Sequence, residues 1–117
     1  MKQVEIIGKF YDNHSLAIIN REIAIRLSDK EKYPDIKLAI TPMDQYDSKH
    51  KVKKDSLKIL KELEANEVEA DIQIRHTYPP MWRWPALDKT KVVYIQPWEY
   101  TKIPFEWQYK FEQFADY

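Results

Sequence analysis

The spacing of apolar and polar residues along the chain predicts strands that alternate with helices. Short segments that are continuously apolar, or that alternate between apolar and polar residues, predict strands at residues 3–7, 35–40, 71–76 and 91–96. Longer amphipathic segments predict helices at residues 16–30 and 51–64, and an aromatic segment predicts a third at 105–115. This order predicts one α/β domain over residues 1–117, a Rossmann-like three-layer sandwich around a mainly parallel four-stranded sheet.

Each of the first two predicted helices has one apolar face, because its apolar residues recur at spacings of three and four. In the first helix the expected face consists of Leu16, Ile19, Ile23 and Leu27. In the second helix it consists of Val52, Ile59, Leu60 and Leu63. The lysines and glutamates on the other side of the second helix are expected to face solvent.

The composition is that of an ordinary globular protein, with 44% apolar and 32% charged residues. Nineteen basic and nineteen acidic residues cancel, so no overall field attracts nucleic acid or an anionic membrane. The chain has no cysteine, which excludes disulfides and thiolate sites, and it has no signal-peptide pattern, so we expect a cytoplasmic setting. Aromatic residues make up 14% of the chain and all four tryptophans follow residue 81, which indicates either a dense local core or a stacking surface.

Ligands of open parallel sheets bind beyond the carboxyl ends of the strands. That rule selects the loops at residues 8–15, 41–50, 76–88 and 97–104. Gly8, the only glycine, directly follows the first predicted strand. It allows either a tight strand-to-helix turn or the close approach of a ligand. Phe10 and Asn13 stand where a dinucleotide fingerprint requires glycines, so NAD and FAD are disfavoured.

Two further segments place polar and aromatic side chains at the same edge. His76 ends the third predicted strand, and it is either a hydrogen-bonded packing residue or a ligand-binding group. In the segment QPWEY, Trp98 can stack on a sugar face and Glu99 can accept hydrogen bonds from hydroxyls. The alternative is that Trp98 packs beside Trp82 and Trp84 while Glu99 caps a helix.

Several other kinds of site are excluded by their missing motifs. The three histidines, His14, His50 and His76, have no metal-ligand spacing, so we expect no metal. There is no P-loop, and no serine lies in a nucleophile elbow. We therefore expect no cofactor.

Three segments, taken together, resemble the N-terminal half of GT-B-fold glycosyltransferases of the group 1, or family 4, kind. They are GKFYDNHSLAIINREIAIRL, DIQIRHTYPPMW and VVYIQPWEYTKIPFEW, which span nearly the whole chain and occur in the family's order. The resemblance implies that the loop that begins at Gly8, with Tyr11, Asp12 and His14, lies near the acceptor and the donor phosphates. It implies that His76 positions the reacting hydroxyl, and it suggests the strand order 3-2-1-4.

The resemblance also implies that a second, C-terminal domain binds the nucleotide sugar, and we expect that domain to be missing from this chain. The expected function is that of the acceptor-side domain of an enzyme that transfers a sugar from a nucleotide sugar to a hydroxyl. We expect no transferase activity from this chain alone, because half a cleft stabilises no departing nucleotide. The apolar fourth strand would lie at an uncovered edge, which predicts self-association or pairing with a separate C-terminal polypeptide.

Two alternatives remain open at this point. The first is a non-catalytic assembly module with a glycosyltransferase-like fold. Its contact surface would be the aromatic C-terminal helix, unless those rings form only the core face of that helix. The rings are Phe105, Trp107, Tyr109, Phe111 and Phe114. The second alternative is an unrelated doubly wound nucleotide-binding domain.

Overall fold

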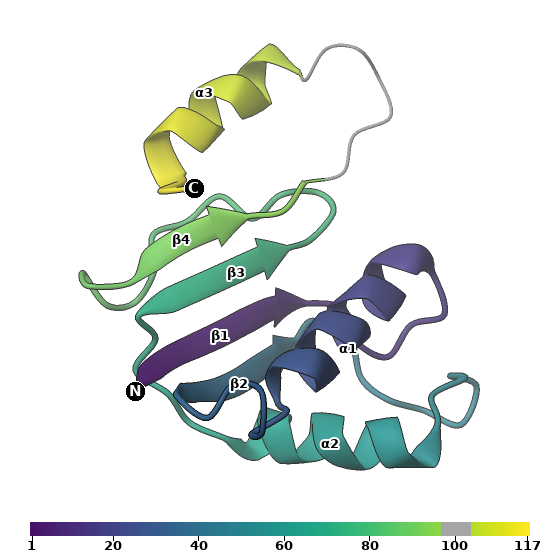
Figure 1. The fold of residues 1–117 in the computed structure, drawn as a ribbon. Coiled ribbons are helices and arrows are strands. Elements are labelled where there is room, and N and C mark those ends of the chain that lie inside the picture. Colours follow the sequence, from purple (N-terminus) through teal and green to yellow (C-terminus); the bar gives the residue numbers. More distant parts are fainter. Residues whose placement is uncertain (97–103) are drawn as a thin grey trace.

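The computed structural model describes residues 1–96 and 104–117, in which strands and helices alternate as predicted (Figure 1). The elements are β1 (Lys2–Gly8), α1 (Ser15–Leu27), β2 (Ile36–Pro42), α2 (Lys54–Ala65), β3 (Ile72–His76), β4 (Lys91–Tyr94) and α3 (Phe105–Phe114). The predicted α/β class and the order of the elements are confirmed. Within the described residues, no helix is long and apolar enough to cross a membrane.

The four strands form an all-parallel sheet in the order β2-β1-β3-β4. The suggested order 3-2-1-4 is therefore wrong, although β4 does lie at an edge as that order required. β1 is central in both arrangements, and its buried Ile6 and Ile7 point to opposite faces. The difference concerns β3, which pairs with β1 on the side away from β2, with Gly8 opposite His76.

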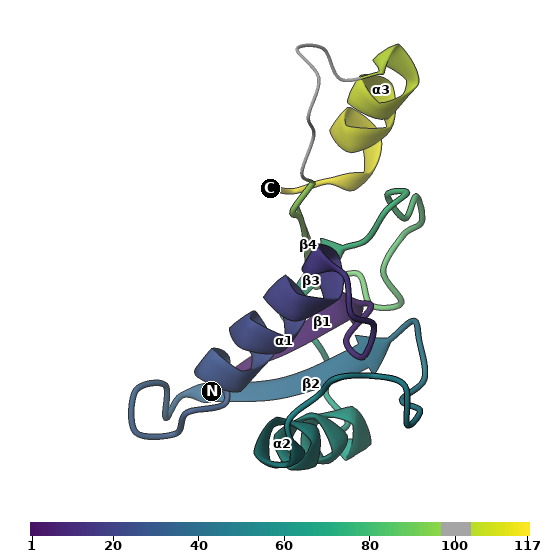
Figure 2. The same cartoon turned by 90° about the vertical axis from the view of Figure 1, so that its right-hand side faces the viewer.

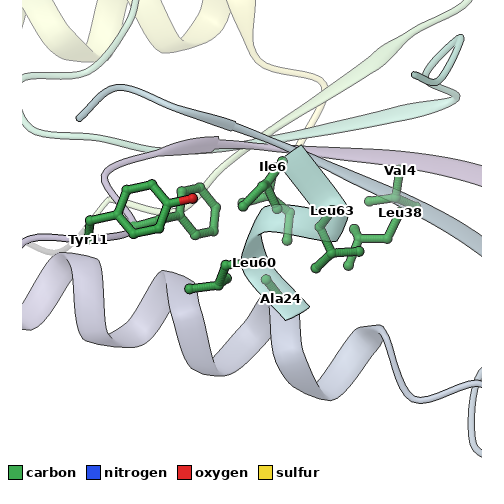
Figure 3. Packing of buried hydrophobic residues seen from close by; sticks show 9 residues of the cluster. Val4, Ile6, Tyr11, Ala24, Leu38, Leu60 and Leu63 are labelled. Carbon is green, nitrogen blue, oxygen red and sulfur yellow. The ribbon is translucent and has the colours of Figure 1, made fainter. Parts of the chain in front are cut away.

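Helices α1 and α2 pack together against one face of the sheet. Their side chains and those of β1 and β2 point toward one another in a single apolar cluster (Figure 3). The buried members of this cluster are Val4, Ile6, Phe10, Tyr11, Ala24, Leu38, Ile40, Leu60 and Leu63. Leu60 and Leu63 confirm part of the predicted apolar face of α2. Figure 2 shows α1 and α2 from the end of the sheet at which the strands finish.

The buried face of α1 differs from the predicted one. Ala17, Asn20 and Ala24 are the buried residues of this helix, whereas Ile19 is 42% exposed. The other three predicted residues, Leu16, Ile23 and Leu27, are half-buried. Small side chains at Ala17 and Ala24 allow the helix to approach the sheet closely, and the larger aliphatic residues then flank the contact.

A ladder of polar side chains crosses the opposite face of the sheet. Glu5 accepts hydrogen bonds from Thr41 and Gln73, both at 2.6 Å. Gln73 in turn accepts one from Nε of the buried Arg75 at 2.7 Å, and Arg75 donates to the Tyr94 hydroxyl at 2.9 Å. The same guanidinium donates to the carbonyls of residues 81 and 83, so it fastens the loop after β3 to the sheet.

On this second face, α3 and the loop after β3 form an aromatic cluster. Trp82 lies with its ring centroid 4.8 Å from Phe111, and Tyr94 lies 5.2 Å from Phe111. Trp84 lies 4.7 Å from Phe114, although it remains 64% exposed. The rings pack on one another, but α3 buries no residue completely, so the choice between a dense local core and a stacking surface stays open. Figures 1 and 2 show α3 beyond the β4 edge of the sheet, next to the loop after β3.

The outer edge of β4 is paired by the chain's own last residues. The N–H groups of Asp116 and Tyr117 donate to the Val92 carbonyl at 2.9 and 3.1 Å. The Tyr94 N–H donates to the Tyr117 carbonyl at 2.9 Å, and the Val92 N–H donates to the Asp116 carboxylate at 2.8 Å. The expectation of an uncovered edge is therefore wrong at Val92 and Tyr94. Pairing with another polypeptide along this stretch stays a prediction, and it requires residues 116–117 to be displaced.

Candidate functional site

A pocket of about 300 Å³ lies where β1, β2 and β3 end. Its walls come from the loop after β1 and the first turn of α1 (Lys9, His14, Leu16), from the residue after β2 (Met43), and from residues 76–78. Parallel strands present their carboxyl ends at one edge, which is why these distant segments meet. The edge selected from the sequence thus holds a hollow of the size of a small ligand.

His76 is the most buried polar side chain of this pocket, at 1% exposed. Its Nδ1 lies 2.7 Å from the amide oxygen of Asn20. The amide nitrogen of Asn20 donates to the carbonyls of Lys9 and His76, at 3.0 and 3.2 Å. Since these two bonds fix the orientation of the amide, its oxygen faces the ring and Nδ1 must carry the proton.

The other ring nitrogen of His76, Nε2, is an unprotonated acceptor. It is buried and has no hydrogen-bond partner among the described residues. Burial lowers the pKa of His76 below its ordinary value, because the charged form loses its hydration. The ring is therefore neutral near pH 7, and its Nε2 is a buried acceptor that no described residue uses.

Gly8 supports the His76–Asn20 pair. A Cβ at this position would lie 2.5 Å from Nδ2 of Asn20 and 2.5 Å from the His76 carbonyl oxygen. Its φ is not positive, so the backbone does not require glycine for a left-handed turn. The chain's only glycine makes room for Asn20 to reach the end of β3, and direct contact of Gly8 with a ligand stays a prediction.

Asp44, which the sequence analysis missed, holds the loop after β1. Its carboxylate accepts hydrogen bonds from the N–H groups of Phe10, Tyr11 and Asp12, at 2.9, 3.1 and 2.9 Å. Arg21 donates to the carbonyls of Phe10 and Asp12 from the other side, at 2.9 and 2.7 Å. The available signal was an aspartate just beyond the end of β2, at the same edge as Gly8, but no motif marks it.

Tyr11 lies in the core instead of the pocket. It is 1% exposed, and its hydroxyl donates to Glu64 of α2 at 2.6 Å. Burial raises the pKa of Tyr11, and the hydrogen bond to Glu64 raises it further. Its predicted contact with a substrate therefore has no support from its position.

Asp12 and His14 form an exposed pair at the rim of the pocket. The two side chains lie 3.2 Å apart between Asp12 Oδ2 and His14 Nε2, and Lys9 Nζ is 3.9 Å from the same carboxylate oxygen. The N–H of Asn13 is the main cause that lowers the pKa of Asp12, and His14 adds to it. His14 lines the pocket and Asp12 orients it, so both predicted residues lie at the site's margin.

Two predicted site residues, Trp98 and Glu99, lie outside the described residues. Neither their contact with a ligand nor the alternative of packing and capping is therefore tested. Among residues 1–96 and 104–117, no group of three histidine, aspartate or glutamate side chains is placed to hold a metal ion.

Comparisons with known proteins do not place the chain in a family. A scan against protein-family models, a search of curated proteins and a search of solved structures each found no match. The resemblance to glycosyltransferases thus rests on the three sequence segments alone. The chain is a small α/β domain with a four-stranded parallel sheet and a histidine-lined pocket at its carboxyl edge.

Proposed function

We propose that the pocket binds a neutral, hydroxyl-bearing small molecule such as a sugar, and that Nε2 of His76 accepts a hydrogen bond from one of its hydroxyls. The observation that carries the proposal is this buried nitrogen, which has no partner within the described residues. A buried acceptor without a donor is costly, and a ligand hydroxyl would satisfy it.

The remaining walls of the pocket fit such a ligand. Leu16, Met43 and Tyr78 supply apolar surface. The Tyr78 ring packs edge-on against Trp107, and the residue still leaves 61% of its surface exposed for contact with the apolar face of a sugar. Lys9 supplies a charged donor at the rim, where Asp12 partly balances its charge. Apolar walls with a few placed polar groups are typical of small-molecule sites.

In a complete transferase this pocket would form the acceptor side of the cleft. His76 would then receive the proton of the attacking hydroxyl, with Asn20 holding the ring in the required tautomer. The motifs quoted above support this assignment, whereas the strand order 2-1-3-4 differs from the order that they suggest. The donor nucleotide sugar would contact a separate domain, and the chain alone would bind acceptors without turnover.

The test follows the side-chain nitrogens of His76 by NMR during titration with glucose, mannose and inositol. We expect a saturable shift of Nε2 with at least one of these probes. We also expect His76→Gln to weaken binding at least about ten-fold, equivalent to one hydrogen bond. His50→Gln is the matched control, because the His50 ring accepts from the Asp47 N–H outside the pocket. Absence of any saturable shift, or equal binding by His76→Gln, would refute the proposal.

The alternative of an assembly module built on α3 has less support. Of its five rings, Trp107, Phe111 and Phe114 contact aromatic residues of the loop after β3. Phe105 and Tyr109 are left exposed, at 82% and 63%. Two separate exposed rings make a small docking surface.

A further inference from the structure

We propose that the loop after β1 is an anion-binding site that the chain fills with its own Asp44. Three consecutive backbone N–H groups, those of residues 10, 11 and 12, converge on this one carboxylate within 3.1 Å. Successive N–H groups that point to one spot form a concave donor site typical of phosphate-binding loops. Asp44 comes from a different strand end, 32 to 34 positions away, so its arrival here is a tertiary contact.

The loop is held in its donor arrangement by a second contact. Arg21 of α1 binds the carbonyls of Phe10 and Asp12, which fixes those groups on the side opposite the converging N–H groups. The N–H groups therefore stay aligned through α1 as well as through Asp44. Such a preorganised set of donors would bind an external anion if the carboxylate were absent.

The position of the loop after β1 in the fold makes Asp44, which occupies the anion site, important for specificity. In parallel α/β folds, a ligand's phosphate commonly binds where the first strand feeds into its helix. Here those donors are taken, and the negative charge of Asp44 repels a second anion. Asp44 is thus a specificity-determining residue that directs the pocket toward ligands without a phosphate at this loop. This last step rests on the proposed function, whereas the anion site itself does not.

The experiment replaces Asp44 and adds inorganic phosphate. In Asp44→Ala we expect phosphate to cause saturable shifts of the amide resonances of Phe10, Tyr11 and Asp12. The affinity should be at least about ten-fold higher than in the wild-type chain. Sodium chloride at equal ionic strength serves to remove general salt effects. Asp47→Ala is the matched control, since the Asp47 carboxylate accepts from the Lys49 N–H and touches none of the three donors.

A loss of folding in Asp44→Ala still gives a decisive result. Phosphate that binds only the folded chain must then raise the folded fraction of this variant, and sodium chloride must not. Asp44→Asn, which keeps one acceptor oxygen but no charge, should remain folded and bind phosphate more tightly than wild type. The proposal is overturned if neither variant gains phosphate affinity or phosphate-dependent folding, or if Asp47→Ala gains as much. The readout uses loop amides and phosphate, so its failure is distinct from a failure of sugar binding at His76.

Discussion

Replacement of Gly8 by alanine tests whether the chain's only glycine exists to admit Asn20. The added Cβ would lie 2.5 Å from both Asn20 Nδ2 and the His76 carbonyl oxygen. The carbonyl cannot retreat easily, because β1 is paired on both sides and Gly8 itself stands opposite Pro42 and His76. Asn20 must therefore move, which breaks its hydrogen bonds to the Lys9 and His76 carbonyls.

The expected loss of stability follows from these contacts. Overpacking a buried position costs about 1–3 kcal/mol. Each lost hydrogen bond adds about 1 kcal/mol. The reduced freedom of the unfolded chain offsets about 0.4–1 kcal/mol. The sum is a destabilisation of about 2–5 kcal/mol, which lowers the melting temperature of a domain of this size by about 10–20 °C.

Urea denaturation of Gly8→Ala, Asn20→Ala and the double variant measures the effect and its origin. Since Asn20→Ala removes one of the two clashing groups, the double variant should be more stable than additivity predicts, by about 1 kcal/mol. If the free energy of unfolding of Gly8→Ala lies within about 0.5 kcal/mol of the wild-type value, the packing role is refuted. Strictly additive effects would show that Asn20 is not the group in conflict.

Two other predictions concern buried groups. Burial lowers the pKa of His76 from 6.5, so the unfolded chain binds its proton more tightly. The contribution of His76 to the free energy of unfolding is full above pH 6.5 and is lost as pH falls through its lowered pKa. Denaturation at a series of pH values should show this drop in the free energy of unfolding for wild type and His50→Gln but not for His76→Gln. The same dependence of the free energy of unfolding on pH in all three proteins would contradict the prediction. Tyr11→Phe removes the hydroxyl that binds Glu64, so we expect a loss of about 1 kcal/mol in thermal unfolding. Tyr109→Phe, at an exposed position, should leave the stability unchanged. Unchanged stability of Tyr11→Phe would argue against the hydrogen bond to Glu64.

The order and the approximate bounds of all elements were predictable, because each has its own apolar pattern or proline boundary. The strand order was not predictable. The buried residues of β1 show only that this strand is internal, and β1 is internal both in the suggested order 3-2-1-4 and in the observed order 2-1-3-4. The predicted buried face of α1 was wrong because an apolar pattern gives the large Ile19 more weight than the small Ala17. Close packing on the sheet nevertheless favours the smaller side chain there.

The position of His76 at the ligand edge was predictable from the end of β3, but its chemistry was not. Asn20, which sets its tautomer, is 56 positions away and stands as one polar residue in an amphipathic helix. Asp44 acts on backbone N–H groups, which carry no side-chain signature. Partners that meet only through tertiary structure leave no local pattern in a single sequence.

The aromatic cluster makes tryptophan emission a local reporter in this protein. Trp82 and Trp107 contact rings across the junction of α3 with the loop after β3, and Trp84 contacts Phe114. Among the described residues, the apolar cluster under α1 and α2 contains Phe10 and Tyr11 but no tryptophan. Fluorescence of the described tryptophans therefore reports the docking of α3, whereas far-ultraviolet circular dichroism reports the helices and sheet as a whole. Comparing the two signals during unfolding would show whether the C-terminal helix and the pocket-bearing sheet melt as one cooperative unit.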